Sequence, residues 1–254
     1  MTARIGRGSL DAMFELLLAT ALQNAAVPIE TEVLEGIRAP AAPICSVTLH
    51  VGVDEAGEPF DRSVYRYDAP SDEWSLVSFN GGPPPEEELE EFEKNGRDGG
   101  DRSDDPVLPG AFYADSVSKL SADWVRLSPS EETEAVLYGL EDLPEDTVIA
   151  NGRDLSDNIR LQFLIEKAEN GPRIAMAFGQ LKKSWRIPLI ARIDRFDIAR
   201  RFAPASQETG VPGAMLPVAE HVEISADVLG KDRSAVIDTT YGDWDCEPGS
   251  TDES

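Results

Sequence analysis

The sequence predicts an α+β protein whose main element is a curved antiparallel β-sheet, an open half-barrel covered by a few helices. From Val47 onward, apolar and polar residues alternate along most of the chain, which is typical of strands with one buried face. Turn-forming residues separate these runs, and Asn170-Gly171 between two alternating runs is the clearest hairpin signal. After residue 120 no helical pattern separates successive strands, so a parallel sheet is disfavoured.

The N-terminal part has two interpretations. Two arginines precede an apolar stretch over 12–26, as in a signal peptide, but Glu15 interrupts that stretch. Ser9 can instead cap an amphipathic helix, because its hydroxyl can accept a hydrogen bond from a backbone N–H of the first turn. We favour a helix over 8–26 of the mature chain and keep a signal sequence as the alternative.

The sheet is expected to occupy residues 47–242. A helical insertion over 84–120 interrupts it, because acidic residues follow three prolines there as in a first helical turn. Strands are predicted at 47–53, 63–68, 74–79, 124–127, 134–138, 159–165, 174–178, 186–202 (one strand or a pair), 222–228 and 235–241. Residues 243–254 are expected to form a disordered acidic tail. No linker or internal repeat divides the chain, so we expect a single domain over 1–254.

The charge and the cysteine content exclude several classes of function. The chain has 48 acidic and 23 basic residues and a formal net charge of −25 at pH 7. Such a chain repels phosphate backbones, so we expect no nucleic-acid partner. Two cysteines and two histidines are too few for Cys₄ or Cys₂His₂ zinc sites, while a disulfide between Cys45 and Cys246 stays open. No stretch is long and apolar enough to predict an integral membrane segment.

The motifs of common enzyme classes are missing from the sequence. It contains no Walker A loop, no Gly-rich dinucleotide fingerprint and no G-x-S-x-G elbow. His50 and His221 lie on the polar side of alternating strands, where a solvated histidine is favoured over a general base. The segment 98–105 lacks the ligand spacing of an EF-hand, so a solvated acidic loop is favoured over a calcium site. We therefore expect no catalytic residue, no metal site, no cofactor and no enzymatic activity.

One stretch, residues 182–201, is rich in basic residues although the chain as a whole is acidic. One explanation is internal pairing with acidic regions such as 86–93, and the other is a docking surface for a phosphate or an acidic partner. The docking candidates are Lys182, Lys183, Arg186, Arg192 and Arg195.

Aromatic residues are frequent on the predicted strands. Most of them are expected in the core, but a curved sheet lined with aromatic side chains can also hold an acyl chain or another apolar ligand. The candidates for such a cavity are Tyr65, Tyr67, Trp74, Phe79, Phe163, Phe178, Trp185 and Phe196.

The order of these elements resembles the LolA-like group, the periplasmic lipoprotein carriers and their related sensor proteins. The resemblance includes the early helix, the strand Val47–Val53, the segments Tyr65-Arg66-Tyr67-Asp68 and Trp74-Ser-Leu-Val77, and the helical insertion after Gly81-Gly82-Pro83. It implies a strongly curved antiparallel half-barrel closed by helices, with lipid chains on its apolar concave side. It also implies a place in the bacterial envelope, in the periplasm, which the residues alone leave undetermined.

Taken together, these observations predict a soluble, non-enzymatic binding protein. Its ligand is expected to be a hydrophobic small molecule or a lipidated protein, held in the concavity of the sheet. The alternative is an interaction or scaffold domain whose core is filled by its own side chains and whose stretch 182–201 contacts an acidic partner.

Overall fold

The computed structural model describes most of the predicted sheet. The described residues are 27–28, 44–71, 73–98, 125–126, 135–140, 143, 149–150, 153–154, 156–168, 171–187, 191–206 and 215–247. The predicted helix at 8–26 and the part of the helical insertion after Asp98 lie outside these residues.

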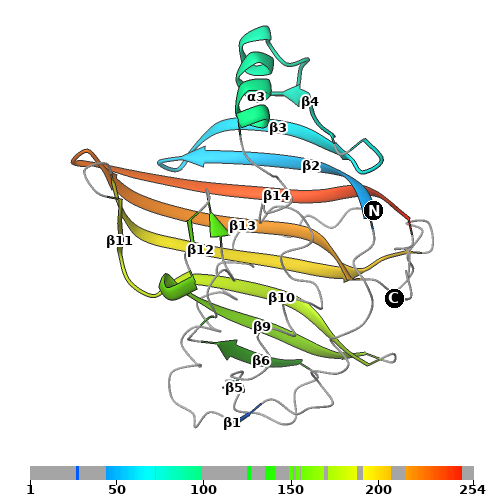
Figure 1. The fold of residues 1–254 in the computed structure, drawn as a ribbon, viewed down its shortest axis with the longest axis vertical. Helices are drawn as coiled ribbons and strands as arrows, with labels where there is room; N and C mark the ends of the chain where they lie inside the picture. Colours follow the sequence, from blue (N-terminus) through cyan, green and yellow to red (C-terminus); the bar gives the residue numbers. More distant parts are fainter. Residues whose placement is uncertain are drawn as a thin grey trace.

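The core of the fold is one twelve-stranded sheet in which every pairing is antiparallel (Figure 1). From one edge to the other its strands are β1 (Val27–Pro28), β5 (Val125–Arg126), β6 (Ala135–Leu140), β9 (Ile159–Ala168), β10 (Gly171–Leu181), β12 (Ala191–Pro204), β13 (Met215–Val228), β14 (Lys231–Glu247), β2 (Ile44–Glu55), β3 (Glu58–Asp68) and β4 (Glu73–Phe79). The short β11 (Trp185–Ile187) pairs with β12, as expected for a strand pair over 186–202. A separate ribbon joins β7 (Ile149–Ala150) and β8 (Arg153–Asp154), and the 3₁₀ turn η4 (Ser156–Asn158) precedes β9.

The sheet is open, because its two edges β1 and β4 lie at opposite ends of the molecule (Figure 1). The predicted antiparallel sheet is therefore confirmed. In the part of the chain that is described, one α-helix occurs, α3 (Glu86–Asp98), within the predicted insertion. It lies beside β3 and β4 at one end of the sheet, where the ring of Phe92 is 5.8 Å from that of Tyr65, so it does not cover the middle of the sheet (Figure 1).

Three tight turns fix the register of neighbouring segments. Each has two central residues with positive φ, and the second is glycine: Ala56-Gly57, Asn80-Gly81 and Leu229-Gly230. This is the conformation that matches the right-handed twist of paired strands, and glycine adopts it without strain.

Among paired strands, β14 and β2 are the farthest apart in the chain: the last strand of the sheet lies beside its first long strand. Cys45 lies opposite Cys246 in this pair, and the two residues, 201 positions apart, form a disulfide. β14 continues to Glu247, and Trp244 stacks on Tyr241 with ring centroids 6.2 Å apart. The expectation of a disordered tail from residue 243 is therefore wrong for residues 243–247, because a covalent cross-link and strand pairing hold them.

The pairing register assigns side chains to the two faces of the sheet. One row of cross-strand neighbours runs Phe163, Ala177, Arg200, Glu220, Thr239, Val51 and Ser63. The next row is Ile198, Val222, Ile237 and Val53. Directly opposed residues point to the same side, so both rows lie on one face, which we call the apolar face. His221, Asp238 and Arg62 belong to the alternate positions and lie on the opposite face, which we call the polar face. Over β6, β10 and β12 this face also carries a buried apolar cluster of Leu137, Met176, Phe178 and Ala199.

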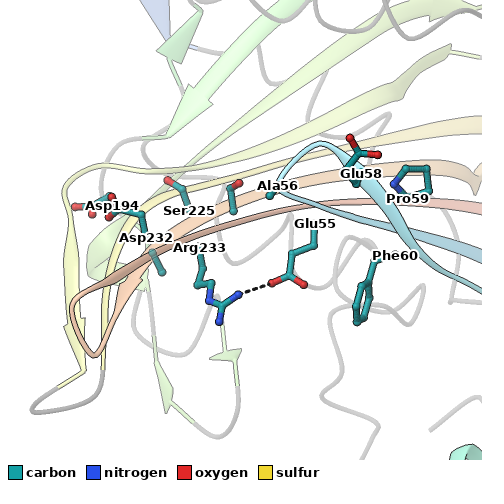
Figure 2. A pocket seen from close by; sticks show the side chains of 11 residues that line it. Glu55, Ala56, Glu58, Pro59, Phe60, Asp194, Ser225, Asp232 and Arg233 are labelled. Atoms are coloured by element: carbon teal, nitrogen blue, oxygen red, sulfur yellow. Dashed lines mark hydrogen bonds and ion pairs between the residues drawn. The ribbon is translucent and has the colours of Figure 1, made fainter.

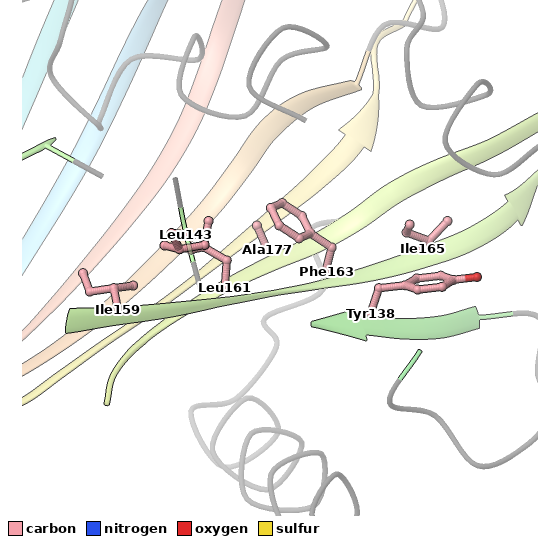
Figure 3. Close-up of a cluster of buried hydrophobic side chains, with 7 residues drawn as sticks. All are labelled: Tyr138, Leu143, Ile159, Leu161, Phe163, Ile165 and Ala177. Atoms are coloured by element: carbon pink, nitrogen blue, oxygen red, sulfur yellow. The ribbon is translucent and has the colours of Figure 1, made fainter. Parts of the chain in front are cut away.

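The best-packed part of the apolar face lies over β6, β9 and β10, where seven buried side chains form one cluster (Figure 3). Phe163 and Ile159 are fully buried there. Gly179 leaves room for this packing, because a Cβ at its position would lie 2.7 Å from Cγ2 of Ile198. The members of the cluster are Tyr138, Leu143, Ile159, Leu161, Phe163, Ile165 and Ala177.

Candidate functional site

The predicted aromatic lining divides between the two faces. Phe163 lies opposite Ala177, whereas Phe178 lies opposite Gln162, so these two rings point to opposite sides of the sheet. The cause is a register shift between Ile174 and Met176, which moves every later side chain of β10 to the other face. Strict alternation in the sequence predicts that the side chains before and after this bulge lie on the same face of the sheet.

The other aromatic candidates form two groups on the apolar face. Trp185 and Phe196 pack against the cluster around Phe163. Tyr65, Tyr67 and Trp74 pack against Val47 and Leu49 at the β2–β4 end, where the rings of Tyr67 and Trp74 are 5.1 Å apart. Phe79 is partly buried opposite Ser63.

Between these groups, the apolar face contains a buried ion pair. Nε of Arg200 donates to Oε2 of Glu220 at 2.6 Å, and Nη2 of Arg200 contacts the same oxygen. The side chains are 1% and 6% exposed, and the buried Thr239 lies opposite Glu220. Sequence reasoning missed this pair, although Arg200 follows Ile198 by two positions and so falls on the apolar phase of the strand.

On the polar face, His221 lies between two carboxylates. Its Nδ1 is 2.7 Å from Oδ1 of Asp238 and its Nε2 is 3.3 Å from Oε1 of Glu223. Carboxylates only accept hydrogen bonds, so both ring nitrogens act as donors and the pKa of His221 is raised, first by the hydrogen bond to Asp238 and second by that to Glu223. The expectation of a solvated strand histidine is wrong here, because the register sets Asp238 directly opposite His221. His50 is exposed, as predicted.

The same carboxylates bind part of the predicted docking stretch. Arg195 contacts Asp197 at 2.5 Å and Glu223 at 2.6 Å, so Glu223 links an arginine to His221 across β12, β13 and β14. Both ring nitrogens of His221 contact carboxylates, which favours the protonated imidazole and leaves neither nitrogen free to act as a base.

The remaining docking candidates differ in their surroundings. Arg192 contacts Asp194 at 2.8 Å, and hydrogen bonds from Arg192 and Ser184 lower the pKa of Asp194. Lys183 and Arg186 are exposed, whereas Lys182 is partly buried and its backbone N–H donates to the carbonyl of Asn158. The acids that pair with Arg192 and Arg195 lie on β12 and β13.

A groove lies at the end of the sheet where the β2–β3 and β13–β14 hairpins turn (Figure 2). Its volume is about 530 Å³. Figure 2 shows Glu55, Arg233 and Phe60 pointing to the same side, and Nη1 of Arg233 is 3.3 Å from Oε1 of Glu55. We call it the hairpin groove; it is lined by Glu55, Ala56, Glu58, Pro59, Phe60, Asp194, Ser225, Ala226, Asp232, Arg233 and Ser234. No local sequence pattern joins these four segments, so sequence reasoning could not find it.

Comparison with protein-family models, with curated proteins and with solved structures finds no match for this chain. The resemblance to the LolA-like group therefore stays an expectation from the order of elements. Within the described residues, no helix has the length and apolar character needed to cross a bilayer.

Proposed function

We propose that this protein binds a hydrophobic ligand, an acyl chain or a lipidated partner, on the apolar face of its sheet. The observation that supports the proposal is the partial exposure of apolar side chains on that face, between the two aromatic groups. Ile198, Ile237 and Val53 lie in one cross-strand row there, and each is only partly buried. Apolar side chains that the protein's own packing leaves partly open gain free energy when a ligand covers them, about 25 cal/mol per Å² of apolar area.

The arrangement around this row favours an elongated ligand. Aromatic side chains border it toward β4 with Tyr65 and Tyr67, and toward β11 with Trp185. An acyl chain lying across the strands contacts successive cross-strand neighbours, which are spaced by about 4.8 Å. The disulfide between Cys45 and Cys246 supports an oxidising compartment such as the periplasm, since stable disulfides are rare in the cytosol.

Mass spectrometry of lipids that copurify with the full chain tests the proposal, together with displacement of an environment-sensitive acyl probe. We expect a bound lipid and saturable displacement by free fatty acid. The absence of both overturns the proposal.

Two tryptophan substitutions on β14 provide a matched comparison. Ala235 is partly buried on the apolar face, and Thr240 is exposed on the polar face. Ala235→Trp adds an apolar ring where the ligand is proposed to lie and should weaken probe binding by about tenfold, whereas Thr240→Trp should leave it unchanged. Equal effects of the two substitutions contradict the assignment of the face.

The alternative, a scaffold domain with a self-filled core, is favoured by the complete burial of Phe163 and Ile159 over β9. A charge reversal that tests the docking hypothesis cannot include Arg195, because it would remove the arginine that contacts the buried Asp197. Lys183→Glu with Arg186→Glu changes exposed residues only. If the docking hypothesis holds, this double variant loses an acidic partner while its unfolding midpoint is unchanged.

A further inference from the structure

The hairpin groove exists because one hairpin is longer than its neighbour. Ala235 of β14 lies opposite Glu55 at the end of β2, and the backbone N–H of Ala56 donates to the carbonyl of Ser234 at 3.0 Å. The exposed residues Lys231–Ser234 therefore extend past the β2–β3 turn. The groove lies between this overhang and the turn (Figure 2).

Two local backbone irregularities present large apolar side chains to solvent at this end. Val53 pairs with Asp61 and Asp54 with Pro59, so Phe60 is the additional residue of a bulge, and it is 61% exposed. Leu229, at the tip of the β13–β14 hairpin, has a φ of 53° and is 77% exposed. Bulges redirect side chains, and a left-handed leucine is strained. Neither side chain is buried by the described part of the chain, so we take a contact with a partner as the explanation of both arrangements.

The charges of the groove indicate what would bind there. Glu55 pairs with Arg233 and Asp194 pairs with Arg192, whereas Glu58 and Asp232 have no ion pair in the part of the chain that is described. The groove thus offers two carboxylates on different hairpins: Glu58 lies two residues before Phe60 in β3, and Asp232 lies three residues after Leu229 at the start of β14. The net charge of −25 adds a long-range field that attracts cations.

We propose that the hairpin groove and Leu229 form a docking surface for a partner protein segment that carries a lysine or arginine next to an apolar residue. At each of two places a basic side chain would pair with one carboxylate, Glu58 or Asp232, and the apolar side chain next to it would cover Phe60 or Leu229, respectively. A second copy of this chain fits poorly, because two molecules of charge −25 repel each other. Leu229 projects from the hairpin tip, beyond the residues that line the groove, so a peptide segment can contact both.

Selection from a phage library of random short peptides on the full chain, with intact disulfide, tests the proposal. Peptides that also bind a variant chain carrying Glu58→Lys and Asp232→Lys are discarded as background. Both substituted positions are exposed. We expect the selected peptides to be enriched in lysine or arginine adjacent to an apolar residue. Selection of acidic or neutral peptides, or no enrichment over the subtracting variant, overturns it.

Affinity measurements on a selected peptide locate the surface. Asp232→Lys should raise its Kd about tenfold, with a weaker salt dependence, while Glu73→Lys, the same charge change at an exposed site of β4, should not. Leu229→Asn is the sharpest variant, since asparagine suits the left-handed turn position. It should raise the unfolding midpoint and still weaken binding by about tenfold. Unchanged binding in Leu229→Asn contradicts the role of the tip.

Two further probes distinguish other occupants. Phenethylammonium tests for a small organic cation, and vesicles of phosphatidylcholine test for a lipid surface. Binding of either probe that depends on Glu58 and Asp232, together with failure of the peptide selection, replaces the proposed partner with that ligand. These outcomes are independent of acyl-probe binding on the apolar face.

Discussion

The buried ion pair between Arg200 and Glu220 offers a quantitative test of the apolar face. Replacing Glu220 by alanine leaves a guanidinium in a site where its side chain is only 1% exposed. Removing the carboxylate partner of a buried charge destabilises a protein by about 3–5 kcal/mol. Domains are stable by about 5–15 kcal/mol, so Glu220→Ala should remove a large part of the free energy of unfolding.

Two further variants separate charge from packing. Glu220→Gln keeps the shape and one oxygen acceptor but removes the charge, so its loss should be smaller than that of Glu220→Ala. Arg200→Met combined with Glu220→Leu removes both charges and should restore stability to the level of the original chain or above it.

Urea unfolding followed by tryptophan fluorescence and by circular dichroism measures these differences, with the slope against urea as a check that the unfolded state is unchanged. The reasoning is refuted if Glu220→Ala costs less than about 1 kcal/mol, or if the double variant is as unstable as the single one. The first result would mean that water or another group compensates the charge of Arg200, and the second that apolar side chains do not pack in this site.

Three other predictions follow from particular contacts. Gly179→Ala should lower the free energy of unfolding by about 1–3 kcal/mol, measured as a lower urea midpoint, because the new Cβ would lie 2.7 Å from a methyl carbon of β12. The raised pKa of His221 means that its hydrogen bond to Asp238 contributes stability that is fully present below the unfolded-state pKa and is lost as the pH rises through the folded-state pKa. A pH series of urea midpoints should show this loss in the original chain and not in His221→Gln; parallel curves would exclude it. Reduction of the Cys45–Cys246 disulfide, which closes a loop of 201 residues, should destabilise the fold by about 2–4 kcal/mol, and an unchanged midpoint in reductant would show that strand pairing alone holds β14 to β2.

Part of the candidate site was predictable from the sequence. The aromatic residues of β3 and β4 were assigned to the lining of the sheet, and Tyr65, Tyr67 and Trp74 do lie together on the apolar face. Phe178 was assigned to the same surface and lies on the other one, because a single bulge in β10 reverses the alternation. The alternating pattern of apolar and polar residues is the same with or without a bulge, so the pattern alone cannot reveal one.

The charged residues show the same limit. Arg192 and Arg195 were identified as a basic surface, yet their partners Asp194, Asp197 and Glu223 neutralise them within the sheet. Asp194 and Asp197 were visible in the sequence as neighbours of these arginines. Glu223 comes from another strand, and only the register of β12 against β13 brings it within reach.

By itself, the sequence determined that this chain forms successive antiparallel strands joined by tight turns, because alternation and turn preferences act between residues close in the chain. Only the tertiary structure decided that β14 pairs with β2, that Cys45 meets Cys246, that Asp238 lies opposite His221, and that two hairpins of unequal length leave a groove between them. These features depend on the register between strands far apart in the chain. That register is set by the packing of the whole sheet and cannot be read from any one segment.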